Sequence, residues 1–518
     1  MIVVGSGIAG LVSACDLALS GVDVVVLERA ETLGGKLHQR HVNGVGIDSG
    51  PTVFTMRWIF EDLFERAGTR LDHELVCHRA EILARHAWSA SERFDLYADR
   101  QRARQEVERF SGRAEADRFD AFCDLAQTAY RTLEGAYIRS ERPTFTSMNR
   151  DLGARGLRVL WQLGLFQNLW TSLSRHFKDP RLHQLFSRYA TYCGSSPLQA
   201  PATLMLIADV EMQGVWTIEG GMTALAHAIA KLAQRHGAEI RTQCEVSDIL
   251  VGNDRVSGVA LRNGECLQAD AVIFNGDVAA LKQQAVGIRR DHPKGGLLNA
   301  AVFGPAEDDL HKRSLSALTL SMHAKTEGFP LVYHNLFFNQ DYAREFSDIF
   351  RDRRLPQQPT VYVCAQDRDD LATPANGPER LLLLVNAPAT GDRAPFTDSE
   401  IRECTDASFS LMQRCGLSIN HCEANTLITT PAQFHQRFPA TGGALYGQAT
   451  HGWMHAFSRW GSTSRLSGLL LAGGSVHPGP GVPMAALSGR LAAATLMAHL
   501  GLTKPSRRVV ISGGTSMR

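Results

Sequence analysis

The sequence predicts a mixed α/β protein built on a Rossmann-like dinucleotide-binding domain. Three observations predict this fold class. A short apolar run at residues 2–4 is followed by glycines at G-x-G-x-x-G spacing. The segment 8–19 is typical of an apolar helix, and a second apolar run at 22–27 ends in Glu28. This order of strand, glycine turn, helix, strand and acid is the pattern of a nucleotide-binding βαβ unit.

Each residue of this first unit has a physical role. Gly5 permits a tight turn, Gly7 lets the backbone approach a pyrophosphate, and Gly10 allows the helix to pack closely on the strand. The helix directs its N-terminal amides and its dipole at the phosphates. Glu28 follows Gly10 by 18 residues, and we expect it to accept hydrogen bonds from ribose hydroxyls.

A second group of residues extends the predicted phosphate cradle and adds another tight turn. Its members are Arg29, Gly34, Gly35, Lys36, Gly50, Pro51 and Thr52. Gly44 and Gly46 follow no strand-to-helix pattern and instead predict a hairpin turn. A glycine pair after the acid resembles the amine-oxidase-like superfamily of FAD flavoproteins. The resemblance implies one non-covalent FAD, and we expect electrons to leave the substrate without help from a nicotinamide, because no second G-x-G-x-x-G unit is present.

The middle of the chain returns to the nucleotide-binding domain. Gly220 and Gly221 precede a helix that ends at Gly237, and alternating residues from Ile240 to Val246 predict a strand. Asn263-Gly264 predicts a two-residue hairpin turn. In the resembled superfamily, the strand near Val246 contacts the adenine end of FAD, and a strand ending near Asn275 closes the FAD sheet.

The stretch "GGSVHPGPGVPMAALSG" is dense in glycine and proline. The resemblance implies that Gly473, Gly474 and Pro483 form a third FAD contact, in which backbone amides approach the cofactor and a helix over 485–500 follows. Many relatives have an acidic residue at the position of Gly474, so ribityl recognition is expected to rest on backbone groups here. His477 has two readings, a turn stabiliser beside Pro478 or a proton-transfer residue, and the first is favoured.

Four longer motifs make the resemblance specific. The chain resembles bacterial carotenoid desaturases of the phytoene desaturase family, and most of all those acting on hydroxylated or methoxylated carotenoids such as hydroxyneurosporene. This implies FAD-dependent removal of hydrogens from adjacent carbons in carotenoid biosynthesis, with the protein orienting an apolar chain and excluding water. The motifs are "GIDSGPTVFTMRWIFEDLFERAG", "WTIEGGMTALAHAI", "GGALYGQATHGWMHAF" and "LLLAGGSVHPGPGVPMAALSGR".

Other functions stay open at this stage. A phytoene desaturase of the same family, another flavin oxidase acting on an amine or a porphyrinogen, and a prenyl-binding escort protein without redox activity share the expected fold. No residue is identified as catalytic, and the electron acceptor, oxygen or a quinone, and the oligomeric state are left open. Tyr333, His334 and Asn335 are candidates for reading a substrate hydroxyl, with an exposed hairpin as the alternative.

The domain organisation is predicted to be discontinuous. Segments 1–75, 212–290 and 455–503 form the FAD-binding domain, and two inserts interrupt it. Residues 76–211 are expected to be a mostly helical substrate or membrane region, with a strand-like stretch "RHAWSASERFDLYAD", and 291–454 a mixed substrate-binding domain. Residues 504–518 read as a flexible basic tail.

Composition excludes several function classes and favours a membrane surface. The net charge of +1 provides no field for nucleic acid, and the ten cysteines show neither a CxxC pair nor zinc-ligand spacing, so no metal is expected. No apolar run reaches a membrane span. A carotenoid is lipophilic, so we expect a cytoplasmic protein peripherally associated with the inner membrane, through the apolar segment 157–170. That segment lies within residues 151–181, which carry five Lys or Arg and two Asp.

Overall fold

The computed structural model describes residues 1–501 of the chain with short gaps. The gaps are residues 145, 146, 149, 151, 152, 154, 155, 157, 158, 160, 162, 165, 292–295, 307–309 and 374. The predicted tail 504–518 lies outside the described residues. Leu157 and Leu160 lie outside them as well, so the helix expected at 157–170 falls partly beyond what the structure describes.

A five-stranded parallel sheet forms the centre of the nucleotide-binding region. Its order is β22 (Leu469–Leu471), β13 (Val272–Phe274), β1 (Ile2–Val4), β2 (Val25–Leu27) and β9 (Glu239–Arg241). The sheet therefore joins segments from the start, the middle and the end of the chain. The strands are three residues long, and their apolar side chains alternate between two buried faces.

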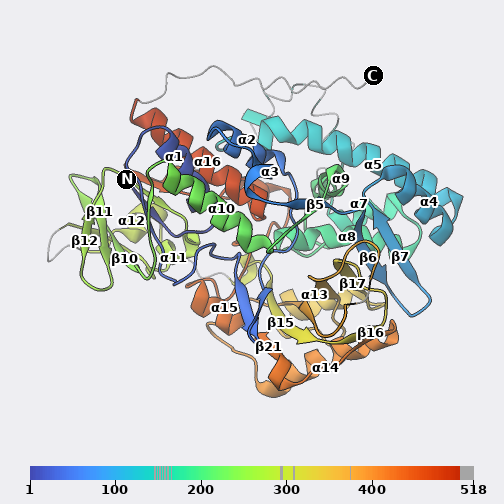
Figure 1. Cartoon of the computed structure of the whole chain (residues 1–518). Helices are drawn as coiled ribbons and strands as arrows, with labels where there is room; N and C mark the ends of the chain where they lie inside the picture. Colours follow the sequence, from blue (N-terminus) through green and yellow to red (C-terminus); the bar gives the residue numbers. More distant parts are fainter. Residues whose placement is uncertain are drawn as a thin grey trace.

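Three helices cover one face of this sheet. They are α1 (Ile8–Leu19), α10 (Met222–Arg235) and α16 (Val482–His499), which lie side by side in Figure 1. The helix predicted at 8–19 is confirmed, and the C-terminal helix begins three residues before the predicted position. Val3, Val26 and Ile273 point into the core shared with these helices, whereas their neighbours on each strand face the opposite core.

The second face packs against a smaller four-stranded sheet. Its order is β12 (Cys266–Gln268), β11 (Arg255–Leu261), β10 (Val246–Gly252) and β14 (Gly287–Arg290). The hairpin predicted at Asn263-Gly264 joins β11 and β12, and the hairpin at Gly44 joins β3 (Gln39–Val42) to β4 (Val45–Asp48). Helices α11 (Val278–Lys282) and α12 (Asn299–Phe303) lie beside this sheet (Figure 1).

The single strand predicted from Ile240 to Val246 is wrong. The parallel strand β9 ends at Arg241, and β10 begins at Val246 in the other sheet. Between them Gln243 has a φ of 57°, and the amides of Gln243 and Cys244 donate to the carbonyls of Ala30 and Glu28. The alternation of apolar residues continued across a turn, so periodicity did not reveal the break.

A seven-stranded sheet lies on the other side of the molecule, in the lower part of Figure 1. It combines strands of both inserts, because β6 and β7 come from 76–211 and the other five from 291–454. Helix α14 (Asp398–Arg414) covers one face, where a large apolar cluster forms the core. The order is β21 (Thr426–Thr429), β15 (Ser316–Ala324), β19 (Glu379–Ala387), β18 (Val361–Ala365), β17 (His334–Phe337), β6 (Ile82–Ala87) and β7 (Arg93–Tyr97).

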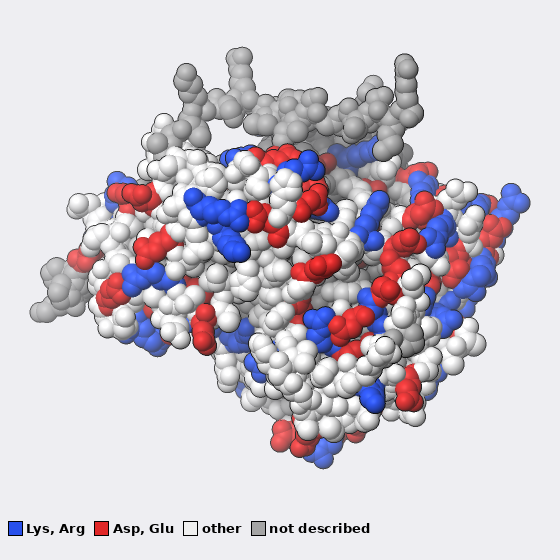
Figure 2. Space-filling model, viewed as in Figure 1, with Lys and Arg blue, Asp and Glu red and all other residues white. Residues whose placement is uncertain are grey.

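The rest of the first insert is helical and has an aromatic core. Phe119, Phe122, Phe177 and Phe186 are fully or almost fully buried there and contact one another. Figure 2 shows basic and acidic side chains interspersed over α4 and α5, in agreement with ion pairs such as Arg104 to Asp117 and Asp120. The helices are α4 (Arg100–Ser111), α5 (Arg113–Leu133), α7 (Leu169–His176), α8 (Pro180–Ser187), the short η2 (Arg188–Cys193) and α9 (Leu206–Gln213).

Shorter elements complete the fold. Among the described helices, none is both long enough and apolar enough to cross a membrane. The remaining elements are α2 (Trp58–Arg66), α3 (Leu71–Glu74), β5 (Cys77–Arg79), η1 (Glu134–Ile138), η3 (Ala202–Met205), β8 (Trp216–Ile218), η4 (Leu310–Lys312), β16 (Thr326–Gly328), α13 (Tyr342–Phe350), β20 (Leu417–Ile419), η5 (Glu423–Asn425), α15 (Pro431–Arg437) and η6 (Trp453–Phe457).

Candidate functional site

The first glycine turn closes around the side chain of Asn275. The Asn275 amide donates to the Gly5 carbonyl at 3.0 Å, and Gly5 has a φ of 95°. A β-carbon at Gly10 would lie 2.1 Å from the Gly5 oxygen and 2.6 Å from Asn275 Nδ2, and one at Gly7 would lie 3.0 Å from the same nitrogen. The turn and the start of α1 therefore admit no side chain at Gly10.

Glu28 is held by the glycine turn itself. Its carboxylate accepts hydrogen bonds from the amide and hydroxyl of Ser6, each at 2.8 Å, and from the amide of Ala30 at 2.9 Å. A carboxylate offers about four acceptor positions, so capacity remains for one further donor such as a ribose hydroxyl. The role of Ser6 was not predicted, although a hydroxyl residue between the first two glycines was the available signal.

The glycine pair after the acid packs directly on the first turn. Gly34 and Gly35 have φ values of 106° and 60°, and a β-carbon at Gly35 would lie 3.2 Å from Gly7 Cα. Lys36 donates to the Leu445 carbonyl, and burial lowers the pKa of its ammonium group. These contacts join the predicted cradle to the segment "GGALYG".

Arg29 contacts a different part of the protein from the other predicted cradle residues. It is exposed, and its guanidinium donates to the carbonyls of Gln436 and Arg437 at the end of α15. Val246 is buried at the start of β10, in the core that also contains Leu27. Val246 therefore lies near the strand that ends in Glu28, whereas the contacts of Arg29 are with protein carbonyls.

The predicted turn at Gly50 lies against Lys36, which follows the glycine pair Gly34-Gly35. A β-carbon at Gly50 would lie 1.9 Å from the Lys36 carbonyl oxygen, and Pro51 is exposed. The Thr52 hydroxyl lies 2.6 Å from the hydroxyl of Tyr362 on β18. This hydrogen bond connects the predicted cofactor region to the seven-stranded sheet.

The Asp48 carboxylate fills the space where a side chain at Gly221, directly before α10, would lie. Its carboxylate accepts from the Met222 amide at the N-terminus of α10 and from Gln39 Nε2 at 3.1 Å. A β-carbon at Gly221 would lie 2.2 Å from the same carboxylate. Burial raises the pKa of Asp48, and these hydrogen bonds oppose the rise.

The C-terminal glycine turn meets the same asparagine. Gly473 has a φ of 117°, and a β-carbon there would lie 3.1 Å from Asn275 Oδ1. The Gly473 amide donates to the Ser488 hydroxyl at 2.8 Å, and the Gly474 carbonyl accepts from Arg459. Pro483 occupies the first turn of α16, where a missing amide hydrogen has no cost.

His477 has the contacts of a positioning residue. It is 2% exposed, and its Nε2 lies 2.9 Å from the Tyr137 carbonyl oxygen. Burial lowers the pKa of its imidazole to about 4. The His477 amide also donates to the Trp460 carbonyl at 2.8 Å. These contacts hold the turn between Gly474 and α16.

The turns following β1, β13 and β22 therefore converge at Asn275. These three strands are neighbours in the parallel sheet, and ligands of such sheets bind beyond the carboxyl ends of the strands. Helix α1 begins directly after Gly7 of the first turn, and its N-terminus presents backbone amides to an anion. Because side chains are excluded at Gly10 and Gly473, the arrangement fits a dinucleotide whose pyrophosphate approaches the main chain.

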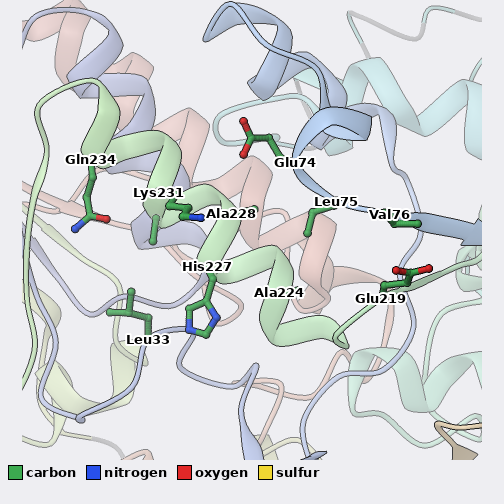
Figure 3. A pocket seen from close by; sticks show the side chains of 11 residues that line it. Leu33, Glu74, Leu75, Val76, Glu219, Ala224, His227, Ala228, Lys231 and Gln234 are labelled. Carbon is green, nitrogen blue, oxygen red and sulfur yellow. The ribbon is translucent and has the colours of Figure 1, made fainter.

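A surface groove lies apart from this cradle. The groove has a volume of about 560 Å³ and is lined by residues of α10 and by Glu74, Leu75 and Val76. Figure 3 shows His227 and Lys231 on α10 and the segment Glu74–Val76 near them. None of the predicted cofactor residues lines the groove. Within the described part of the chain, no group of three or more His, Cys, Asp or Glu residues is placed to hold a metal ion.

Comparison with a family model identifies the fold. The model described as flavin containing amine oxidoreductase matches residues 8–497. The chain belongs to this family. It is an FAD flavoprotein, and the glycine turns around Asn275 are the part of this family member that fits the dinucleotide.

Curated relatives of this flavoprotein act on carotenoids. The chain is 57% identical to hydroxyneurosporene desaturase of Rubrivivax gelatinosus, over 100% of this chain and 97% of the relative. It is 39% identical to the enzyme of the same name from Cereibacter sphaeroides, over 96% and 98% of the two chains. It is 28% identical to 1-hydroxycarotenoid 3,4-desaturase of Flavobacterium sp., over 95% and 98%.

Solved structures agree with the fold of the family. Putrescine oxidase bound to putrescine superposes with a TM-score of 0.57 at 14% identity, covering 96% of this chain and 98% of that chain. An oxidoreductase from Methanosarcina mazei superposes with a TM-score of 0.56 at 15% identity, over 96% and 99%. At this identity the likeness extends to the fold alone.

Proposed function

We propose that this flavoprotein is a desaturase that removes hydrogens from adjacent carbons of a hydroxylated or methoxylated acyclic carotenoid. The observation that carries the proposal is full-length similarity, at 57% identity, to a hydroxyneurosporene desaturase. The predicted FAD cradle supports this proposal, because Thr52 of the cradle contacts the seven-stranded sheet. One face of that sheet is rich in aromatic and aliphatic side chains.

Four tyrosines, two from each insert, favour an apolar, water-poor substrate site. Tyr137, Tyr192, Tyr362 and Tyr446 keep some solvent accessibility, yet desolvation raises the pKa of each hydroxyl, to about 12 for Tyr137 and Tyr446. Side chains that are partly accessible but strongly desolvated are typical of an enclosed space rather than an outer surface. Such a space suits a long polyene.

The chemistry divides between cofactor and protein. Bound FAD supplies the two-electron acceptor that takes a hydride from the substrate carbon next to the polyene. The neighbouring carbon gives up a proton, so two hydrogens and two electrons leave as the double bond forms. The aromatic side chains orient the substrate and exclude water, which keeps the developing positive charge from reacting with solvent. The glycine turns and Glu28 hold the dinucleotide.

A peripheral membrane contact would give access to a carotenoid dissolved in lipid. Trp161, Phe166 and Met454, which we call the exposed apolar cluster, are 76%, 68% and 52% exposed. Phe166 lies edge-on to Trp453 at 5.3 Å, so the cluster joins the segment before α7 to η6. Leu163 and Trp170, expected to contact lipid, instead pack inside: Leu163 is 0% exposed and Trp170 contacts His183 and Tyr342.

The test is anaerobic incubation of the purified holoprotein with hydroxyneurosporene, neurosporene and phytoene in separate reactions. We expect flavin absorbance to bleach with hydroxyneurosporene, with a carotenoid product whose absorption moves to longer wavelength by one added double bond. A clear preference for phytoene would place the chain in another branch of the carotenoid desaturases. No product from any carotenoid would overturn the proposed function. Adding oxygen or a quinone afterwards identifies the acceptor by the rate at which the oxidised flavin spectrum returns.

A further inference from the structure

The face of the seven-stranded sheet opposite α14 carries buried polar side chains. In the register of β17 and β18, His334 pairs with Cys364 and Leu336 pairs with Tyr362. Because side chains alternate along a strand, His334 and Tyr362 project from the same face, opposite to the face covered by α14. The alternative expectation of an exposed hairpin at this segment is wrong, because His334 is 2% exposed and Asn335 is 0% exposed.

On this face a chain of hydrogen bonds runs from Thr52, a predicted cofactor-binding residue, into the sheet. The hydroxyl of Tyr362 lies 2.6 Å from the Thr52 hydroxyl and 2.7 Å from His334 Nδ1. Asn335, on the other face, uses its side-chain amide within the protein, donating to the carbonyls of Val332 and Val363. His334 is therefore joined to Thr52 by side-chain hydrogen bonds, whereas the amide of Asn335 is used by backbone carbonyls.

This chain of hydrogen bonds ends at the second ring nitrogen of His334. His334 Nε2 is buried and makes no hydrogen bond to the residues that the structure describes. Its neutral ring retains either a donor or an acceptor there, whichever role Nδ1 does not take toward Tyr362. A buried polar group left unpaired costs about 1–3 kcal/mol, so an imidazole held in this position by the Tyr362 hydroxyl is expected to have a partner in the working protein.

A second buried group without a full set of partners lies in the helical insert. Arg188 begins η2 and is 7% exposed; its Nε makes no hydrogen bond to the residues that the structure describes, while its Nη1 donates to the Tyr192 hydroxyl at 3.1 Å. Burial lowers the pKa of His334 to about 3, and the positive charge of Arg188 adds to this effect. Arg188 therefore acts on the His334 imidazole through its charge, while its side chain contacts Tyr189 and Tyr192.

We propose that His334, positioned by Tyr362 and Thr52, hydrogen-bonds the terminal oxygen of the carotenoid through its buried Nε2. The inference rests on the proposed function. In a 1-hydroxycarotenoid 3,4-desaturase, as the relative's name states, the oxygen-bearing carbon is two bonds from the bond that is oxidised. The oxygen must then sit near the flavin, and the Thr52–Tyr362–His334 chain of hydrogen bonds starts at Thr52, one of the predicted cofactor-binding residues. A hydroxyl both donates and accepts, so it can pair with a buried imidazole in either tautomer.

The experiment compares His334→Phe, His334→Gln and Tyr362→Phe with wild type. The readouts are kcat/KM for hydroxyneurosporene and the inhibition constant of neurosporene as a competitor, which lacks the oxygen and requires no turnover. We expect His334→Phe to lower kcat/KM about 5- to 10-fold, the value of one hydrogen bond, and to leave the neurosporene inhibition constant unchanged. His334→Gln places an amide near the position of Nε2 and should recover most of the loss. Tyr362→Phe should show a smaller loss of the same kind.

His86→Phe is the matched control. His86 is also a buried imidazole on this face, since it pairs with Leu336 in the next strand, but Trp88, Phe94 and Phe338 surround it. The control should change both readouts in parallel or not at all. A selective loss in His86→Phe, or an equal loss for both carotenoids in the His334 and Tyr362 variants, overturns the inference while the proposed function stands. If wild type does not turn over hydroxyneurosporene, both fail. Should His334→Phe not fold, Tyr362→Phe decides alone, because it removes a single oxygen from a partly accessible residue.

Discussion

At the scale of single residues, the cofactor cradle depends on the absence of side chains. Gly7 has an ordinary φ of −65°, so a larger residue there meets no backbone strain but enters the space beside Asn275. We expect Gly7→Leu to lose most of its FAD, measured as the ratio of flavin to protein absorbance after purification. Denaturing the wild type should release free FAD, since the expected binding is non-covalent.

Gly135→Leu is the control for this prediction. Gly135 is exposed, also lacks a positive φ, and has no atom within 4 Å of the β-carbon position. It should retain full flavin occupancy. Full occupancy in Gly7→Leu as well would show that the pyrophosphate does not lie against this turn.

His477 makes the stability of the folded chain depend on pH. Its folded pKa is about 4 against an ordinary 6.5, so between these values the unfolded state binds more protons. The free energy of unfolding therefore falls as pH falls from 6.5 to 4, by up to about 3 kcal/mol from this residue. His477→Gln cannot titrate and should show a flatter profile in urea denaturation at pH 5 and pH 7. Since all other groups are common to both proteins, identical profiles would contradict the assignment.

At the scale of elements, α1 and α16 pack so closely that one position admits only glycine. A β-carbon at Gly489 of α16 would lie 2.2 Å from the Ala9 carbonyl oxygen of α1. Glycine to alanine in a helix normally stabilises by about 1 kcal/mol. Here we expect Gly489→Ala to destabilise by about 1–3 kcal/mol, because the helices must separate. Helix α1 begins directly after the cradle glycine Gly7, so FAD affinity should fall too.

The exposed residue Ala494 on α16 provides the comparison. Ala494→Gly should cost about 1 kcal/mol from propensity alone and leave FAD affinity unchanged. Urea denaturation and flavin titration measure both effects. A more stable Gly489→Ala protein would mean that the two helices are not in close contact at this position.

At the scale of the whole molecule, the exposed apolar cluster is expected to hold the protein on a lipid surface. Wild type should float with anionic vesicles and be released by high salt or detergent, because basic residues of 151–181 add an electrostatic contribution. Replacing Trp161, Phe166 and Met454 by Ser should abolish flotation without unfolding the protein, as these side chains are exposed.

Leu297 and Leu371 supply the control, since they are 55% and 83% exposed and belong to other regions of the fold. Replacing both by Ser should leave flotation intact. A wild type that remains in the soluble fraction with anionic vesicles would refute membrane association. Equal flotation of the cluster variant would move the lipid contact to another surface.

The sequence by itself determined the features that depend on neighbouring residues. The glycine turn, the helix at 8–19 and the hairpins at Gly44 and Gly264 were all predictable, because tight turns require positive φ or small residues at fixed spacing. The long motifs also indicated the flavoprotein family and its class of substrate. The boundaries of the discontinuous domains remain a prediction from the sequence.

Only the tertiary structure decided which residues meet. Asn275 reaches Gly5 across 270 residues, and Thr52 reaches Tyr362 across 310. Local periodicity carries no information on such pairs, because they depend on how the sheets pack and on which strands become neighbours. The same reason accounts for the break after Arg241, for the burial of Leu163, and for His334, whose imidazole reaches the Tyr362 hydroxyl only because β17 pairs with β18.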